Sequence, residues 1–208
     1  MTLSTVIDSD FGYEPEESTP QHDVVCLNAG TSASEWFASQ VDALGARVWE
    51  PQISLAIDVG SSPRQLEMWV DAASSALRGS PSGPAHILAT GAAAYGAIML
   101  AATYPEQVKS IILGDPEVDT TVEGYATTLR RVQAPSLVIA AAPRSDTDIS
   151  KPQSVAGGID NGVFVIIDNT PAPAHHSRPH SFNEWTKSFM KIAEGLHAVG
   201  SPQEEANA

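Results

Sequence analysis

Two adjacent histidines and one aspartate are the side chains of this sequence whose types best suit acid–base chemistry. His175 and His176 follow one another in a Pro-rich loop, and Asp146 stands in an earlier loop. Imidazole and carboxylate groups can give or take a proton during a reaction, so these three are the candidate catalytic residues. A His-His pair in a Pro-rich loop is also common as a solvated surface feature, and this alternative stays open.

These residues need a framework, and the stretch 86–116 gives the clearest sign of one. Residues 86–89 predict a short buried strand, and the small, unbranched residues of 92–104 favour a helix. Pro105 ends that helix, and the apolar, β-branched run 108–113 is typical of a parallel strand covered on both faces. The stretch is therefore predicted to form a βαβ unit, with a tight turn at Thr90-Gly91.

This stretch resembles the nucleophile-elbow segment of the α/β-hydrolase superfamily. In that segment a strand, Gly-x-Ser-x-Gly and a helix precede Tyr-Pro-Glu-x-Val and another strand. Residues 104–108, Tyr-Pro-Glu-Gln-Val, match well, and counting back from Pro105 places Gly91 at the nucleophile position. No Ser, Cys or Asp occurs within 85–102. The resemblance thus implies an elbow without a nucleophile, at which glycine adopts the strained backbone angles freely.

The resemblance also locates the other two members of the catalytic triad. The position of the acid falls on Arg144, with Asp146 close by. The position of the histidine falls on Ala172, both by counting forward from Ile167 and by counting back from the Pro-x-x-Phe helix start at Pro179. The chain therefore resembles an atypical member that lacks the catalytic Ser and His. His175 and His176 follow in the same loop, and a reshaped loop would bring them to the site.

An oxyanion hole is built from backbone N–H groups, so it does not depend on the missing Ser and His side chains. Asn28-Ala29-Gly30 stands where the family has its His-Gly oxyanion loop. The resemblance implies that the N–H groups of Gly30 and Ala92 form an oxyanion hole, because the fold builds it from these two loops whatever the side chains.

At the level of the fold, the resemblance covers the chain from about residue 23 to 196. It implies an α/β fold with a mostly parallel sheet and helices on both faces. The cap domain is expected to be reduced or absent, because only residues 117–124 separate a predicted strand from the helix at 125–131. The expected organisation has three parts: an N-terminal strand and acidic loop (1–22), a single domain (23–198) and a flexible tail (199–208).

Composition excludes several classes of function. The formal net charge of −14 disfavours nucleic acid and anionic membranes as partners. No run is apolar enough to span a bilayer, so the protein is expected to be soluble and cytoplasmic. The single Cys26 excludes an internal disulfide, and its apolar strand setting predicts a buried thiol. No metal-ligand spacing and no phosphate-binding glycine pattern appears, so neither a metal nor a cofactor is expected.

Three functions stay open. The first is a non-hydrolytic enzyme of isomerase, epimerase, cyclase or lyase type, which uses acid–base chemistry and oxyanion stabilisation on a small molecule. The second is a catalytically silent protein that binds a ligand or a partner. The third, an esterase with a rearranged site, is disfavoured because a triad without its nucleophile keeps only a weak residual rate. An open, apolar pocket mouth at Ile53, Leu55, Ile57 and 117–125 is expected to bind a small molecule, and a second copy or a protein partner to cover it.

Overall fold

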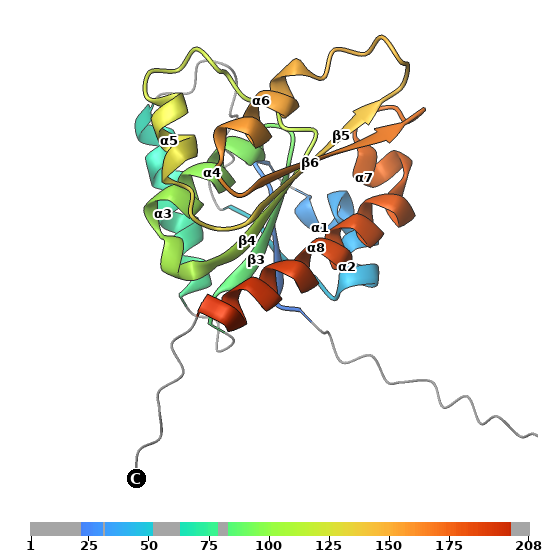
Figure 1. The fold of residues 1–208 in the computed structure, drawn as a ribbon. Helices are drawn as coiled ribbons and strands as arrows, with labels where there is room; N and C mark the ends of the chain where they lie inside the picture. The colour runs from blue at the N-terminus through green and yellow to red at the C-terminus, as the bar shows by residue number, and fades with distance from the viewer. Residues whose placement is uncertain (1–21, 31, 52–62, 79–82, 201–208) are drawn as a thin grey trace, which may run out of the picture.

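The computed structural model describes residues 22–30, 32–51, 63–78 and 83–200. Six strands form one sheet in the order β2-β1-β3-β4-β5-β6, and every neighbouring pair is parallel (Figure 1). The strands are β1 (Val24–Leu27), β2 (Arg47–Trp49), β3 (Ala85–Thr90), β4 (Val108–Gly114), β5 (Ser136–Ala142) and β6 (Gly162–Asp168). The strands predicted at 86–89 and 108–113 are found as β3 and β4, and the predicted α/β class is confirmed.

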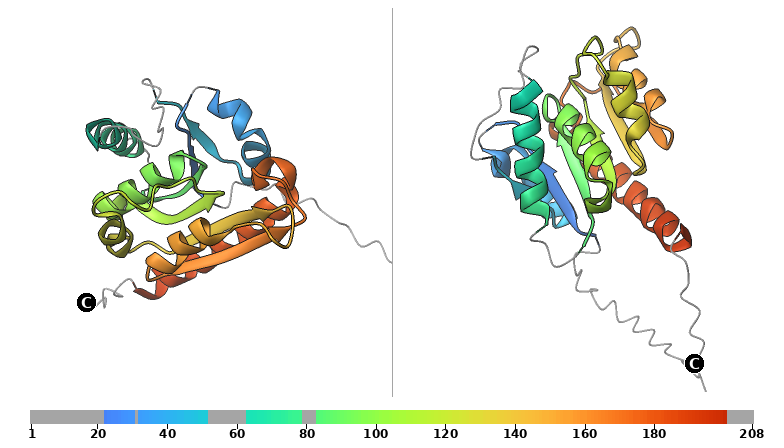
Figure 2. Two further views of the ribbon diagram at one scale, coloured as in Figure 1. Left: turned by 90° about the horizontal axis from the view of Figure 1, so that it is seen from above. Right: turned by 90° about the vertical axis from the view of Figure 1, so that its left-hand side faces the viewer.

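Helices cover both faces of the sheet (Figure 2). One face carries α3 (Pro63–Leu77), α4 (Ala93–Thr103), α5 (Tyr125–Arg131) and α6 (Ser150–Gly158). The other face carries α2 (Ala38–Leu44), which follows the single-turn α1 (Ala33–Trp36), together with α7 (Ala174–Ser177) and α8 (Pro179–Gly200). Because both faces are covered, the central strands are mostly apolar, and every residue of β1, β3 and β5 is buried.

Close packing on the first face explains the small residues of α4. A Cβ atom on Gly96 would lie 2.5 Å from a ring carbon of Trp69, so only glycine allows α3 and α4 to approach this closely. Trp69 belongs to the apolar stripe of α3, whose other members are Leu66, Val70, Ala73 and Leu77. This stripe packs into the core, and Cys26 on β1 is fully buried as expected.

The last helix begins where the sequence predicts. α8 starts at Pro179 and runs to Gly200. Its apolar residues Trp185 and Ile192 are 49% and 61% exposed, while Thr186 is fully buried. The buried face is rotated because Thr186 satisfies its hydroxyl on the Phe182 carbonyl at 2.9 Å and so tolerates burial.

The connection after β4 contains no cap domain. Residues 115–124 run from β4 to α5 as turns and irregular backbone, in agreement with the prediction. None of the described helices combines the length and the apolar character needed to cross a membrane. The predicted N-terminal strand, the C-terminal tail beyond residue 200 and the pocket-mouth residues Ile53, Leu55 and Ile57 lie outside the described residues.

Candidate functional site

The turn between β3 and α4 has the predicted sharp geometry. Gly91 has a φ of +55°, in the left-handed region that favours glycine. Its N–H donates to the Gly114 carbonyl at 3.0 Å, and its own carbonyl accepts from the N–H of Glu117 at 3.0 Å. A Cβ at position 91 would meet no atom within 4 Å. The turn is therefore held by backbone bonds to the end of the neighbouring strand, and its outer side is open.

An indole covers the residue before this turn. Trp36 ends α1, and its Nε1–H donates to the Thr90 hydroxyl at 2.9 Å. This bond joins the loop after β1 with the end of β3, two strands that are direct neighbours. The carboxyl ends of parallel strands meet at one edge of a sheet, so sequence-distant loops come together there.

The histidine loop is fastened to the same edge by a carboxylate. Asp115 follows β4 with a φ of +44°. Its Oδ1 accepts from the N–H of Ala141 at 2.7 Å, and its Oδ2 accepts from the N–H of Ala174 at 2.6 Å. One side chain thereby connects β4, β5 and the start of α7, the helix that carries His175 and His176. The sequence analysis did not single out Asp115, although an aspartate directly after a buried parallel strand is a recognisable signal.

His175 is fully buried in an aromatic environment. Its ring centroid lies 5.1 Å from that of Trp36, 5.6 Å from Phe37 and 5.8 Å from Phe182. Neither ring nitrogen makes a well-directed hydrogen bond with any described residue. Burial, assisted by the neighbouring His176, lowers the pKa of His175 to about 3, and an interaction with the Trp36 backbone carbonyl opposes this shift. The residue is therefore a neutral packing group without access to solvent.

His176 has the opposite character. It is exposed, its ring lies 4.3 Å from that of Trp36, and its Nε2 is 2.7 Å from the Trp36 carbonyl oxygen. A carbonyl oxygen only accepts, so Nε2 carries the hydrogen of this bond. In the neutral ring, Nδ1 is then the basic nitrogen. The backbone of α1 thus fixes both the orientation and the tautomer of His176.

A cavity of about 400 Å³ opens beside this histidine. Its lining contains a base, a carboxylate, a hydroxyl, an amide and the predicted oxyanion-loop glycine around the indole: His176, Glu35, Ser32, Asn28, Gly30 and Trp36. Glu35 and Ser32 were missed as site residues, because α1 is only one turn long and shows no pattern in the sequence. Ser32 has a left-handed φ of 66°, and its side chain makes no cap hydrogen bond to the helix.

Most of the other predicted site residues lie outside the lining of this cavity. Arg144 and Asp146 are both exposed, and Arg144 Nε lies 2.7 Å from Asp146 Oδ1 in a surface ion pair. Ala172 is exposed in the loop before α7. Of the two predicted oxyanion donors, Gly30 lines the cavity, and Ala92 is not among the described residues that line it. A common direction for the N–H groups of Gly30 and Ala92 stays a prediction.

Comparison with solved structures identifies the architecture. The chain superposes with a TM-score of 0.62 on a protein described as a predicted CIB-like hydrolase from Thermoplasma acidophilum, at 16% identity over 90% of this chain and 89% of that one. It superposes with a TM-score of 0.66 on the meta-cleavage product hydrolase CumD, at 14% identity over 82% and 91% of the two chains. The chain has the α/β-hydrolase fold.

A further α/β-hydrolase-fold neighbour is CarC, a serine hydrolase involved in carbazole degradation, with a TM-score of 0.64 and 12% identity over 82% of this chain and 91% of that one. No family model matches the sequence, and no curated protein matches it. At these identities the likeness concerns the fold alone. In the α/β-hydrolase fold the nucleophile sits on the sharp strand-to-helix turn, which is the place of Gly91 here.

Proposed function

We propose that the cavity beside His176 binds a small carbonyl compound and that this protein is a non-hydrolytic acid–base enzyme of the isomerase, epimerase, cyclase or lyase type. The observation that carries the proposal is the position of His176, which lines a cavity together with Gly30 while its Nε2 is bonded to the Trp36 carbonyl. A base with a fixed tautomer beside backbone donors suits proton removal next to a carbonyl group.

In the proposed reaction, Nδ1 of His176 takes a proton from the carbon next to the carbonyl. The electron pair of the broken C–H bond moves into a new C=C bond, and the carbonyl oxygen becomes an enolate oxygen. The backbone N–H of Gly30 stabilises the negative charge on that oxygen, together with the N–H of Ala92 if it points there as expected. Return of the proton from His176 to the substrate completes the isomerisation.

A silent ligand-binding role is the second candidate, and the Trp36 indole favours it. The indole is bonded to Thr90 directly before the elbow turn, so it occupies space beside the position where a hydrolase would attack its substrate. In this role the exposed residues 120–124 suit a partner or a second copy that covers the cavity. Sedimentation that yields a monomer at high concentration would remove the covering partner from the proposal.

The rearranged esterase has one feature in its favour. Ser32 lines the cavity that holds His176 and Glu35, so a hydroxyl, an imidazole and a carboxylate are near one another. Nucleophile activation requires a hydrogen bond between the hydroxyl and the base. In the part of the chain that the structure describes, no hydrogen bond joins Ser32 to His176. The Nε2 of His176 is bonded to the Trp36 carbonyl instead.

Proton exchange with the solvent distinguishes these functions. A panel of ketones, aldehydes and thioesters is incubated with the protein in D₂O, and loss of the α-proton signal is followed by NMR. The acid–base enzyme should exchange at least one compound, and His176→Gln should slow that exchange by about 100-fold or more. His180→Gln, which removes an exposed histidine from the first turn of α8, is the matched control and should exchange like wild type. Ligand-induced shifts without exchange would identify the silent binder.

A further inference from the structure

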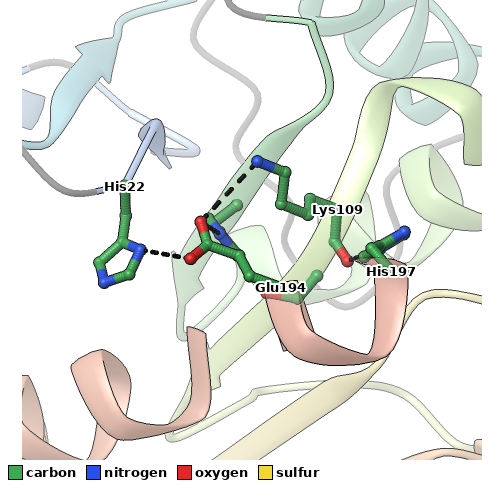
Figure 3. A network of polar contacts seen from close by, with 6 residues as sticks. His22, Lys109, Glu194 and His197 are labelled. Carbon is green, nitrogen blue, oxygen red and sulfur yellow. Dashed lines mark hydrogen bonds and ion pairs between the residues drawn. The ribbon is translucent and has the colours of Figure 1, made fainter. Parts of the chain in front are cut away.

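The amino ends of the strands carry a second cluster of polar side chains, at the edge of the sheet opposite the cavity. His22 precedes β1, His86 is the second residue of β3, and Glu194 belongs to the C-terminal half of α8. Figure 3 shows His22 pointing at the Glu194 carboxylate. His22 Nδ1 lies 3.0 Å from Glu194 Oε2, and His86 Nε2 lies 3.1 Å from Glu194 Oε1.

His22 is buried without a satisfied ring. Neither of its nitrogens makes a well-directed hydrogen bond with a described residue, although Nδ1 is close to the carboxylate. Buried polar atoms of native proteins nearly always have a partner, so an unsatisfied ring that faces a carboxylate and a second imidazole needs an explanation. The rings of His22 and His86 stand nearly perpendicular, with centroids 5.8 Å apart. A ligand between the three side chains would supply the missing partner.

His86 has the surroundings of a metal-binding imidazole. It is fully buried, and its Nδ1 lies 2.8 Å from the Ser110 hydroxyl. A hydroxyl both donates and accepts, so Ser110 can accept Nδ1–H and leave the Nε2 lone pair directed at Glu194. A bond of this kind at the far nitrogen fixes the ring of metal-ligating histidines.

We propose that His22, His86 and Glu194 bind a divalent transition-metal ion, with Zn²⁺ favoured. Two imidazoles and one carboxylate match zinc sites of three protein ligands and one water, whereas Ca²⁺ and Mg²⁺ prefer oxygen ligands throughout. The candidate ligand atoms all lie within 4.8 Å of one another. Zn–N and Zn–O distances of about 2.0–2.1 Å in a tetrahedron separate ligand atoms by about 3.3 Å. The contacts of His22 and His86 to the two Glu194 oxygens are about 0.2–0.3 Å shorter than that spacing, and ligand atoms that lie up to 4.8 Å apart have to close to about 3.3 Å around the ion.

A positive charge near the proposed site, on Lys109, disfavours metal binding. Lys109 Nζ lies 3.8 Å from Glu194 Oε1, and its side chain is partly exposed (Figure 3). Its flexible stem allows the ammonium group to turn towards solvent when a metal ion arrives. Glu194 is partly exposed as well, so the site has an entry path. No metal-ligand spacing is visible in the sequence, because His22, His86 and Glu194 stand far apart along the chain and meet only in the fold.

The test uses the full chain without a polyhistidine tag, freed of metal by a chelator. Calorimetric titration with Zn²⁺ at pH 7.5 should give one site per chain, and Co²⁺ should give the intense visible absorption of a four-coordinate ion. His22→Gln and Glu194→Gln should each weaken binding by about 100-fold, and His180→Gln, a change on the same helix, should leave it unchanged. Lys109→Gln should tighten binding by about three- to tenfold, because it removes a like charge from the ion.

Histidine side-chain NMR of the wild-type protein does not depend on the folding of any variant. Addition of Zn²⁺ should shift the ring nitrogens of His22 and His86 and leave those of His180 in place. Saturating zinc should also raise the unfolding temperature by about 5–10 °C at 100 times its dissociation constant. Absence of zinc binding, binding retained in both His22→Gln and Glu194→Gln, or unchanged His22 and His86 signals would each overturn the proposal. The α-proton exchange assay is independent of this outcome.

Discussion

The Trp36 indole Nε1 and the Thr90 hydroxyl lie 2.9 Å apart, although 54 residues separate them in the chain. This bond joins the helix that carries Glu35 of the cavity to the last residue of β3, directly before the Gly91 turn. It also fixes the ring against which His176 packs. This bond therefore connects the cavity wall directly to the Gly91 turn.

A double-mutant cycle measures this connection. Trp36→Phe keeps an aromatic ring without the N–H, and Thr90→Val keeps the shape of the side chain without the hydroxyl. Each single change should destabilise the fold, and the two should couple by about 0.5–1.5 kcal/mol in denaturant unfolding, the range of one hydrogen bond. Trp185→Phe, at an exposed tryptophan, is the control and should change stability by less than about 0.5 kcal/mol. A coupling near zero would contradict the bond.

The burial of His175 makes stability depend on pH. Its pKa is about 3 in the folded state and near 6.5 when unfolded. Above pH 6.5 both states are neutral and the full stability is present. As the pH falls towards 3, the unfolded chain takes up the proton first, so stability is lost. The contribution of His175 to this loss should be about 2 kcal/mol between pH 7 and pH 5.

The variant His175→Phe isolates that contribution. Phenylalanine suits the aromatic neighbours of this position and cannot take up a proton. Its free energy of unfolding, from urea titrations at several pH values, should fall less steeply between pH 7 and pH 5 than that of wild type. His86 remains in both proteins and contributes the same sign of slope, so the difference belongs to His175. Parallel slopes would mean that the ring is protonated in the folded state.

The central part of the fold could be predicted because local and tertiary preferences agree there. In 85–114 the apolar strands, the Gly91 turn and the Ala-rich helix all favour one structure. α6 could not be foreseen, because Pro152 and Gly157-Gly158 are three poor helix formers in a helix of nine residues. The burial of Val155 and Ala156 against the sheet supplies the stability that propensity does not.

Gly91→Ser restores a hydroxyl at the elbow without a catalytic triad. A side chain at the left-handed φ of +55° should cost roughly 1–2 kcal/mol in unfolding, but no steric clash, since no atom lies within 4 Å of the new Cβ. Gly91→Ala is the matched control for this backbone cost. Neither Gly91→Ser nor Ala172→His should turn over activated acyl esters, because a hydroxyl without a base is a poor nucleophile and a base without a nucleophile has nothing to activate.

Wild type should likewise give no acyl burst in stopped-flow assays. Ester turnover by wild type that disappears in Ser32→Ala or His176→Gln would reverse the proposed function and favour the rearranged esterase. The same turnover in both variants would indicate a contaminating hydrolase.

Asp115→Asn tests the fastening of the histidine loop. The carboxylate accepts one N–H on each oxygen, from Ala141 and Ala174. Asparagine tolerates the positive φ but turns an NH₂ group against one of these donors. Stability should fall by about 1.5–3 kcal/mol, and amide exchange should become faster over 174–178 if the NH₂ faces Ala174, or at Ala141 if the amide is reversed. The exposed Asp160→Asn should show neither effect.

The site was harder to predict than the fold, because its side chains act through tertiary contacts. His175 and His176 are neighbours in sequence, yet one is sealed among aromatic rings and the other lines the cavity. An alternating exposure of this kind depends on the direction of one helical turn, which no local pattern encodes. His86 did give a signal, since a polar residue inside an apolar strand is an informative exception.

The length of α8 links the two ends of the molecule mechanically. Its 22 residues form a rod of about 33 Å, with Pro179 next to α7 and the cavity at one end and Glu194 near the other. A rigid helix moves as one unit. If Glu194 shifts by a few tenths of an ångström when it binds the proposed metal ion, the other end of α8, next to the helix that carries His176, should shift as well. A substitution that tilts α8 to reshape the cavity should therefore also change the position of Glu194 relative to His22 and His86.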